Sequence, residues 1–200
     1  MWISSVSYEK SRGLLRTLYD RVKGPGDNVD NIMLAHSLRP HTLEGHMAIY
    51  KRVLHHTGNT VPKWLLECLG VYTSLHNRCS YCVEHHFSGL CRLLGDSERA
   101  DVIRRALESD NFVDVFDAKE TGALLYAGKL TNSLMSVEEK DAEQLRQLGW
   151  DDGEILEINQ VVAYFAYANR TVLGLGINAK GDILGLSPRN SQDEEDWTHR

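Results

Sequence analysis

Helical periodicity is the feature that most constrains the fold of this chain. Apolar residues recur at three- and four-residue spacing along nearly all of its 200 residues. Glycine and proline mostly fall between these periodic segments, where the start and stop signals of helices belong. Strand-like alternation bounded by tight turns is almost absent. The sequence therefore predicts an all-α fold.

The ends of the predicted helices follow from local signals. Pro40 and Pro62 suit the first position of a helix, and Asn77 suits an N-cap. Ser136 with Glu139 matches a capping box, in which the two side chains bind each other's backbone N–H groups. We expect helices at residues 8–22, 29–37, 40–56, 62–76, 77–95, 97–109, from 117, 136–149 and from 151.

The chain is expected to form one domain followed by a short tail. Residues 1–186 form the predicted helical domain, and residues 187–200 are polar, surface-bound or disordered, with Trp197 as one candidate anchor. A weak internal repeat relates the triplets at 65–67 and 155–157, each about one helix ahead of a similar segment. Two degenerate helical repeats would explain this echo, and chance similarity between amphipathic helices explains it almost as well.

Charge and composition narrow the partners and the compartment. The net charge is −6, and no dense block of Lys or Arg is present, so we expect neither a nucleic acid nor a membrane partner. No apolar run reaches membrane-spanning length, and residues 1–7 do not resemble a secretory signal. We therefore expect a cytoplasmic protein. In that reducing compartment, cysteines more often bind metals or catalyse redox reactions than form structural disulfides.

The chemistry is concentrated in Cys79, Cys82 and His86. Residues three and four apart share one face of a helix, so the two thiols and the imidazole are expected together. A helix N-terminus favours thiolate over thiol, and His86 can take the proton from Cys82 or pair with its thiolate. A thiolate attacks a peroxide oxygen to give a sulfenic acid, which a neighbouring thiol converts to a disulfide. The pattern predicts a thiol redox site.

A metal site is the main alternative interpretation of the cysteine pair. The two thiols with His76, His85 or His86 could hold zinc. Structural zinc sites usually need four ligands, and the chain has no second Cys-x-x-Cys. A thioredoxin-like fold would need strands alternating with helices, and none are predicted. Spacing and compartment therefore favour redox chemistry.

Other polar or reactive residues lie outside the Cys79–His86 segment. Glu67 lies on an apolar stripe, which suits either an edge position or a buried carboxylate that faces the cysteine helix. Cys68 and Cys91 have no partner at motif spacing and suit small buried positions. Most other histidines suit the surface or packing, although His36 or His46 could approach the site from another helix.

Taken together, these residues resemble the alkylhydroperoxidase D-like (AhpD-like) proteins of the carboxymuconolactone decarboxylase superfamily. The family motif is Glu, a gap of eleven residues, and Cys-x-x-Cys-x-x-x-His. Here Glu67 is followed by eleven residues and then by Cys79, Cys82 and His86 at that spacing. The resemblance covers residues 10 to 180. Three further segments look like the subgroup of uncharacterised peroxidase-related enzymes, namely residues 36–37, 124–131 and 169–170.

The resemblance implies an all-helical bundle with a duplicated helical unit, assembled as a homo-oligomer, often a trimer or hexamer. It implies a peroxidase in antioxidant defence, with Cys82 as the peroxidatic thiol. Cys79 would be the resolving thiol and the one exposed to the reductant. Glu67 and His86 would form the proton relay. Superfamily decarboxylases lack the cysteine pair, so decarboxylation is not expected.

One position departs from the family pattern. Well-characterised members carry a second histidine immediately before the second cysteine, and here that position is Tyr81. The relay would then run through the hydroxyl group of Tyr81, through water, or through His85.

The sequence thus predicts hydroperoxide reduction by a Cys79–Cys82 dithiol/disulfide cycle. No organic cofactor or metal is expected, and the chain shows no Gly-rich loop for a nicotinamide or flavin. An external dithiol would therefore reset the disulfide. The alternatives are a thiol–disulfide oxidoreductase or redox sensor, and a non-catalytic helical oligomer with a metal-binding Cys/His cluster.

Overall fold

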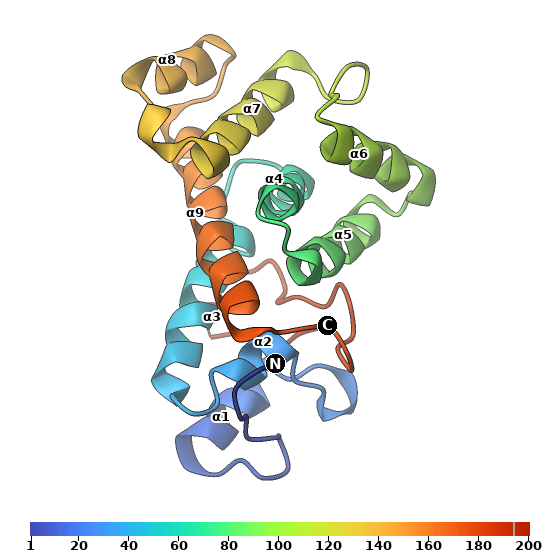
Figure 1. The fold of residues 1–200 in the computed structure, drawn as a ribbon, viewed down its shortest axis with the longest axis vertical. Helices are drawn as coiled ribbons and strands as arrows, with labels where there is room; N and C mark the ends of the chain where they lie inside the picture. Colours follow the sequence, from blue (N-terminus) through green and yellow to red (C-terminus); the bar gives the residue numbers. More distant parts are fainter. Residues whose placement is uncertain (194) are drawn as a thin grey trace.

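Helix α4 lies at the centre of the fold. The computed structural model describes residues 1–193 and 195–200, and within them all regular secondary structure is helical. α4 spans Lys63–His76, and all of residues 65–74 are buried, as expected for a helix that is covered on every side. Figure 1 shows α4 nearly end-on among its neighbours. These neighbours are α5 (Ser80–Leu94), α6 (Ser97–Ser109), α7 (Ala118–Asn132) and α9 (Asp152–Leu175).

The remaining helices lie toward the two ends of the molecule (Figure 1). Three of them gather at one end and α8 lies at the other. They are α1 (Gly13–Val22), α2 (Asn31–Ala35), α3 (Pro40–Leu54) and α8 (Glu139–Gln147), with short 3₁₀ turns at Pro25–Asp27 and Leu134–Ser136. The prediction of an all-α fold is confirmed.

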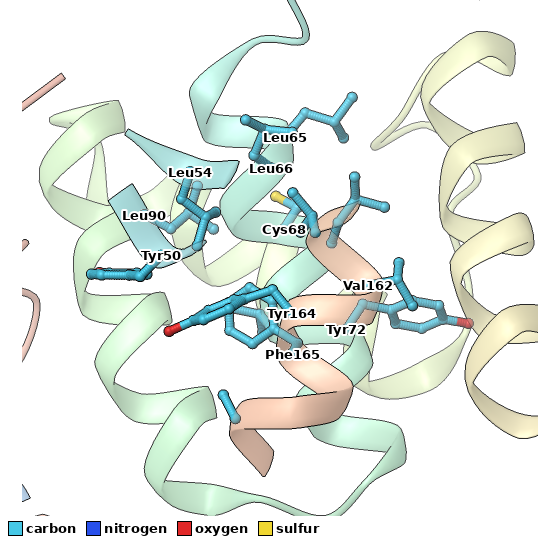
Figure 2. Packing of buried hydrophobic residues seen from close by; sticks show 14 of the residues in the cluster. Tyr50, Leu54, Leu65, Leu66, Cys68, Tyr72, Leu90, Val162, Tyr164 and Phe165 are labelled. Atoms are coloured by element: carbon cyan, nitrogen blue, oxygen red, sulfur yellow. The ribbon is translucent and has the colours of Figure 1, made fainter. Parts of the chain in front are cut away.

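Helices α4 and α9 approach each other closely at a glycine. A Cβ atom at Gly70 of α4 would lie 2.2 Å from Cε2 of Phe165 on α9, so only glycine fits there. Figure 2 shows Phe165 among the buried side chains that these two helices share with their neighbours. This contact fixes α9 against the helix that precedes the cysteines.

Aspartate caps begin three of the helices. Asp96 accepts a hydrogen bond from the backbone N–H of Arg99 at the start of α6. Asp117 and Asp151 each form a capping box with the glutamate three residues later, at the starts of α7 and α9. These starts were predicted and are confirmed.

Other predicted helix starts are wrong. Residues 8–10 form a turn, so the helix predicted over residues 8–22 begins at Gly13. Asn77 closes α4, because its backbone N–H still binds the carbonyl of Thr73, and Cys79 is the N-cap of α5 instead.

The capping box predicted at Ser136 is also displaced. Glu138 and Asp141 form the box of α8, and Lys129 of α7 binds the Asp141 carboxylate at 2.7 Å. The helix therefore begins later than the Ser136 pattern indicates, with Asp141 at its third position.

The C-terminal segment packs against the helices. The Trp197 side chain is only 3% exposed and belongs to the main core. The guanidinium of Arg21 lies 3.6 Å from the centre of a Trp197 ring. The prediction of Trp197 as an anchor is confirmed. The internal repeat stays a prediction, and its second copy, from 155 onward, lies on one uninterrupted helix, α9.

None of the described helices combines the length and the apolar composition that a membrane span requires.

Candidate active site

The two motif cysteines lie at the N-terminus of α5. Cys79 is the N-cap and Cys82 lies one turn into the helix. Their sulfur atoms are 2.9 Å apart, close enough to share a proton, and both are free thiols. The backbone N–H of Cys79 binds the carbonyl of Ser74 at 2.9 Å, so the turn after α4 holds the first cysteine in place. The geometry suits a reduced dithiol that can close to a disulfide.

The two thiols differ in acidity and in placement. The hydrogen bond from Cys82 lowers the pKa of Cys79 despite burial, and the same bond, with burial, raises the pKa of Cys82. The pair therefore releases its first proton readily and its second with difficulty. Cys82 lines a cavity, whereas Cys79 is 0% exposed. The expectation that Cys79 is exposed to a reductant is wrong for the single chain.

Glu67 on α4 faces the cysteine helix. Its side chain is buried, with the residue 2% exposed, and its Oε2 lies 2.7 Å from Nδ1 of His86 on α5. The His86 ring also makes an edge contact with Phe165, 4.5 Å between ring centres. The interpretation of Glu67 as a buried carboxylate facing the cysteine helix is confirmed, and the edge interpretation is wrong. Its part in proton transfer stays a prediction.

Tyr81 and His85 form a second polar group beside the cysteines. The Tyr81 hydroxyl donates to Oδ2 of Asp182 at 2.8 Å and accepts from the backbone N–H of Ile32 at 3.2 Å. His85 Nε2 lies 3.2 Å from the same Oδ2. Burial raises the pKa of Tyr81 well above its ordinary value. The Tyr81 proton is therefore directed to Asp182, and a part for Tyr81 or His85 in the proton relay stays a prediction.

Asn169 on α9 supports the sulfurs from the other side. Its amide donates to Oγ of Ser74 at 3.0 Å, and its Oδ1 accepts from Asn77 at 3.0 Å. Hydrogen bonding from Asn169 also lowers the pKa of both motif cysteines, although it is a smaller effect than the contact between them. The resemblance noted at residues 169–170 thus falls on a residue of the site.

A cavity of about 50 Å³ opens beside Cys82. His46 lines it, as one of the sequence interpretations expected, and burial lowers the pKa of His46 to about 3. Asp30 also lines the cavity, and burial raises the pKa of its carboxyl group to about 7. The other lining residues are Ile32, Met33, Met47, Tyr50, Glu67, Tyr81, His85, His86, Gly89, Tyr164, Ala168, Gly185, Leu186, Ser187 and His199.

The other candidate residues lie elsewhere. Cys68 is buried in the core of α4, as expected for a small apolar residue. Cys91 is half-buried further along α5. His76 contacts Tyr72 and Asp110 rather than the cysteines. Among residues 1–193 and 195–200, no three His, Cys, Asp or Glu side chains lie close enough to hold a metal ion.

The sequence interpretation missed Asp30, Asp182 and His199. Tyr81 and Asp182 are 101 residues apart in the chain, so no local spacing connects them. The signal that could have found Asp30 is weak: it is an acidic residue just ahead of an apolar helix, where a solvated cap is the usual explanation.

Comparisons with known proteins agree with the fold. No protein-family model and no curated protein matches the sequence. Solved structures do match. An uncharacterized peroxidase-related protein from Silicibacter sp. TM1040 has 27% identity over 76% of this chain and 78% of its own, with a TM-score of 0.68. A peroxidase-related protein from Ralstonia eutropha JMP134, described as an alkylhydroperoxidase AhpD core, has 22% identity over 92% and 98%, with a TM-score of 0.69.

A further match carries a different activity in its name. The debrominase Bmp8, solved in complex with 2,3,4-tribromopyrrole, has 15% identity over 83% of each chain and a TM-score of 0.65. At that identity the likeness concerns the fold alone. The structure neighbours match the resemblance found in the sequence, and this chain has the AhpD-like fold of the peroxidase-related proteins.

Proposed function

We propose that this protein reduces hydroperoxides through a Cys79–Cys82 dithiol/disulfide cycle. One observation carries the proposal: a cavity-lining sulfur, Cys82, lies 2.9 Å from a second thiol and one helical turn from a histidine that is held by a buried carboxylate. That arrangement brings nucleophile, resolving thiol and proton carrier together.

The cycle balances with two electrons from the dithiol. The Cys82 thiolate attacks the outer peroxide oxygen, the O–O bond breaks, and the sulfur becomes a sulfenic acid while an alkoxide or hydroxide leaves. The Cys79 thiol then attacks the Cys82 sulfur, forming the disulfide and releasing water. An external dithiol returns two electrons and two protons to the pair.

Cys82 and His86 have different roles in the cycle, and each role has a physical reason. Cys82 is the attacking sulfur although Cys79 is the more acidic, because only Cys82 lines the cavity and the 2.9 Å contact lets the shared proton move to Cys79. His86 supplies the proton to the leaving oxygen. Its Nδ1 is held by Glu67, so the opposite ring nitrogen is the one that exchanges protons, and the carboxylate stabilises the protonated ring.

Burial of the pair favours a small substrate. Cys79 is 0% and Cys82 3% exposed, so a folded protein disulfide cannot reach either sulfur without rearrangement. A general thiol–disulfide oxidoreductase needs such access. The external dithiol meets the same limit, so the burial favours a small, flexible dithiol that can insert one thiol end. A homo-oligomeric assembly remains a further part of the proposal.

The first prediction tests the cycle. Cys82→Ser should abolish peroxide consumption supported by dithiothreitol, because the attacking sulfur is gone. Cys79→Ser should still form one sulfenic acid per chain, detectable by dimedone trapping and mass spectrometry, but should not turn over rapidly. Cys91→Ser, a half-buried cysteine outside the cavity, is the matched control and should turn over normally.

Several outcomes would contradict the proposal. Full peroxide reduction by Cys82→Ser would refute the mechanism. One bound zinc per chain with peroxide-inert thiols would favour the metal-binding alternative. Because one fold neighbour is named a debrominase, the assay includes a bromopyrrole; turnover of that compound with no turnover of peroxide would also refute the proposal.

A further inference from the structure

We propose that the C-terminal strap, residues 185–193 with 195–199, is the size-selecting wall of the thiol site and restricts it to hydrogen peroxide and the smallest alkyl hydroperoxides. The choice of substrate rests on the proposed function, whereas the strap's control of access to Cys82 does not.

The strap is tied down along its length. Arg92 of α5 donates to the carbonyl of Gly185 at 2.6 Å. The buried ammonium of Lys51 on α3 donates to Oγ of Ser191 at 2.8 Å and to the carbonyl of Arg189. Ser191 N–H binds the carbonyl of His55 at 3.2 Å. Together with the buried Trp197, these contacts make the strap a built part of the fold.

Both ends of the strap reach the cavity. Gly185, Leu186 and Ser187 line it from one end and His199 from the other. The His199 ring stacks on Tyr50 with 6.1 Å between ring centres, and its Nδ1 lies 2.9 Å from the carbonyl of Trp197. Burial lowers the pKa of His199 to about 4. The ring is therefore a neutral, fixed part of the wall near neutral pH.

Gly185 lets the strap lie directly on α5. Its φ is +78°, and a Cβ atom there would lie 2.8 Å from Cβ of Ser88 and 3.1 Å from the backbone N of Gly89. A neighbouring cavity of about 210 Å³ shares Gly185 and Ser187 with the cavity at Cys82. Strap residues thus form part of the boundary of both cavities, and their displacement would enlarge the space available at the thiols.

The size of the cavity at Cys82 sets the substrate class. Its volume of about 50 Å³ is about one third of the roughly 150 Å³ of an engineered apolar cavity that accepts benzene. Hydrogen peroxide or methyl hydroperoxide matches that space. A hydroperoxide that carries an aromatic ring does not fit unless the strap moves.

Thiol-modifying reagents of different size test the strap independently of peroxidase activity. Reduced protein would be treated with methyl methanethiosulfonate or with its bulky benzyl analogue, and the modification rate of the Cys79–Cys82 peptide followed by mass spectrometry. His199→Ala removes a ring from the wall, and Gly185→Ala pushes the strap off α5. In both variants the benzyl-to-methyl rate ratio should rise by about tenfold, the scale of steric discrimination in a pocket.

Matched controls separate access from general damage. His41→Ala removes an exposed histidine, and Gly149→Ala introduces the same kind of positive-φ strain at an exposed position with no atom within 4 Å of the new Cβ. Both should leave the ratio unchanged. Arg21→Ala removes the guanidinium that packs on Trp197, outside the cavity. This variant replaces His199→Ala or Gly185→Ala if either of them fails to fold. An unchanged ratio in the folded strap variants would overturn the proposal.

A second measurement addresses substrate choice. The ratio of kcat/KM for cumene hydroperoxide to that for hydrogen peroxide should be low in the wild type and should rise in the strap variants. A changed reagent ratio without any peroxide turnover would support the strap but refute the proposed function. Peroxide turnover with equal preference for both peroxides in the wild type would refute the strap while the function stands.

Discussion

At the scale of single residues, the Glu67–His86 contact gives the sharpest test of the mechanism. Glu67→Gln keeps the size of the side chain and an oxygen that can accept from Nδ1, but it removes the negative charge that stabilises a protonated His86. We expect kcat/KM for peroxide to fall by about 10²-fold, within the usual range for acid–base catalysis, with little change in Tm. The measurement is steady-state peroxide reduction beside a thermal melt.

The control for this variant is Glu98→Gln, an exposed glutamate on α6, which should behave as the wild type. A Glu67→Gln enzyme that retains wild-type kcat/KM would show that the carboxylate only positions the ring.

Contacts between residues on one helix face could be predicted from the sequence. Contacts that form where a distant segment of the chain packs against the site could not. Cys79, Cys82 and His86 share a face because they are three and four apart. The burial of Glu67 against His86 was favoured by a family motif rather than by spacing alone. Asp182 and His199 are far from the cysteine motif in the sequence and reach the site from the segment after α9, so no local pattern indicates them.

At the scale of elements, the crossing of α4 and α9 depends on Gly70. Gly70→Ala places a methyl group 2.2 Å from Phe165. Because this core is close-packed, we expect a loss of about 1–3 kcal/mol in the free energy of unfolding, as is typical of overpacking. Chemical denaturation measures the change. Gly70→Ala combined with Phe165→Leu should lose less than the sum of the two single changes.

A second helical glycine provides a control in which the same substitution should not lower the free energy of unfolding. A Cβ atom added at Gly45 in α3 would meet no other atom within 4 Å. Gly45→Ala should therefore be neutral or stabilise by up to about 1 kcal/mol through helix propensity. If the losses of unfolding free energy from Gly70→Ala and Phe165→Leu add up in the double variant, the Gly70→Ala loss does not come from contact with Phe165.

Some helix ends are set by local sequence signals, and others depend on tertiary contacts. The caps Asp96, Asp117 and Asp151 were predictable because a carboxylate binds N–H groups only two or three residues away. Ser136 offered an equally good local pattern, but the Lys129–Asp141 ion pair between two helices accompanies a later start. Helix existence was therefore easier to predict than helix boundaries.

At the scale of the whole molecule, the all-α class followed from periodicity, while the course of residues 176–193 and 195–200 did not. That segment has no period and few apolar residues, so its packing depends on isolated contacts such as Trp197 with Arg21. The homo-oligomer also stays a prediction. Exposed apolar side chains on α7 and α9, Leu125 at 59% and Leu156 at 60%, are candidates for its interface.

Buried histidines should make the whole fold sensitive to acid. Burial lowers the pKa of His46 to about 3 and of His199 to about 4, and holds that of His55 well below its ordinary value. In the unfolded chain these rings titrate near pH 6.5. The unfolded state therefore binds more protons below that pH, and stability that is complete above about pH 6.5 is lost as the pH falls toward 4.

The buried carboxyl of Asp30 acts in the opposite direction. Its pKa is raised to about 7 in the folded state, so between about pH 4 and 7 the folded state binds the extra proton and acidification stabilises it. Burial also lowers the pKa of His36, so four histidines oppose one aspartate and unfolding takes up protons on balance. The free energy of unfolding should then fall as the pH drops from roughly 6 to 4, at about 1.4 kcal/mol per pH unit for each net proton taken up.

The prediction is tested by urea unfolding across that pH range. His55→Phe should make the pH slope shallower by about one proton, and it should fold, because among the described residues neither ring nitrogen of His55 has a hydrogen-bond partner. Asp30→Asn should make the slope steeper by a similar amount. His41→Phe, at an exposed position, should leave it unchanged. A wild-type slope in His55→Phe would mean that the buried ring gains its proton without global unfolding, through local opening around it.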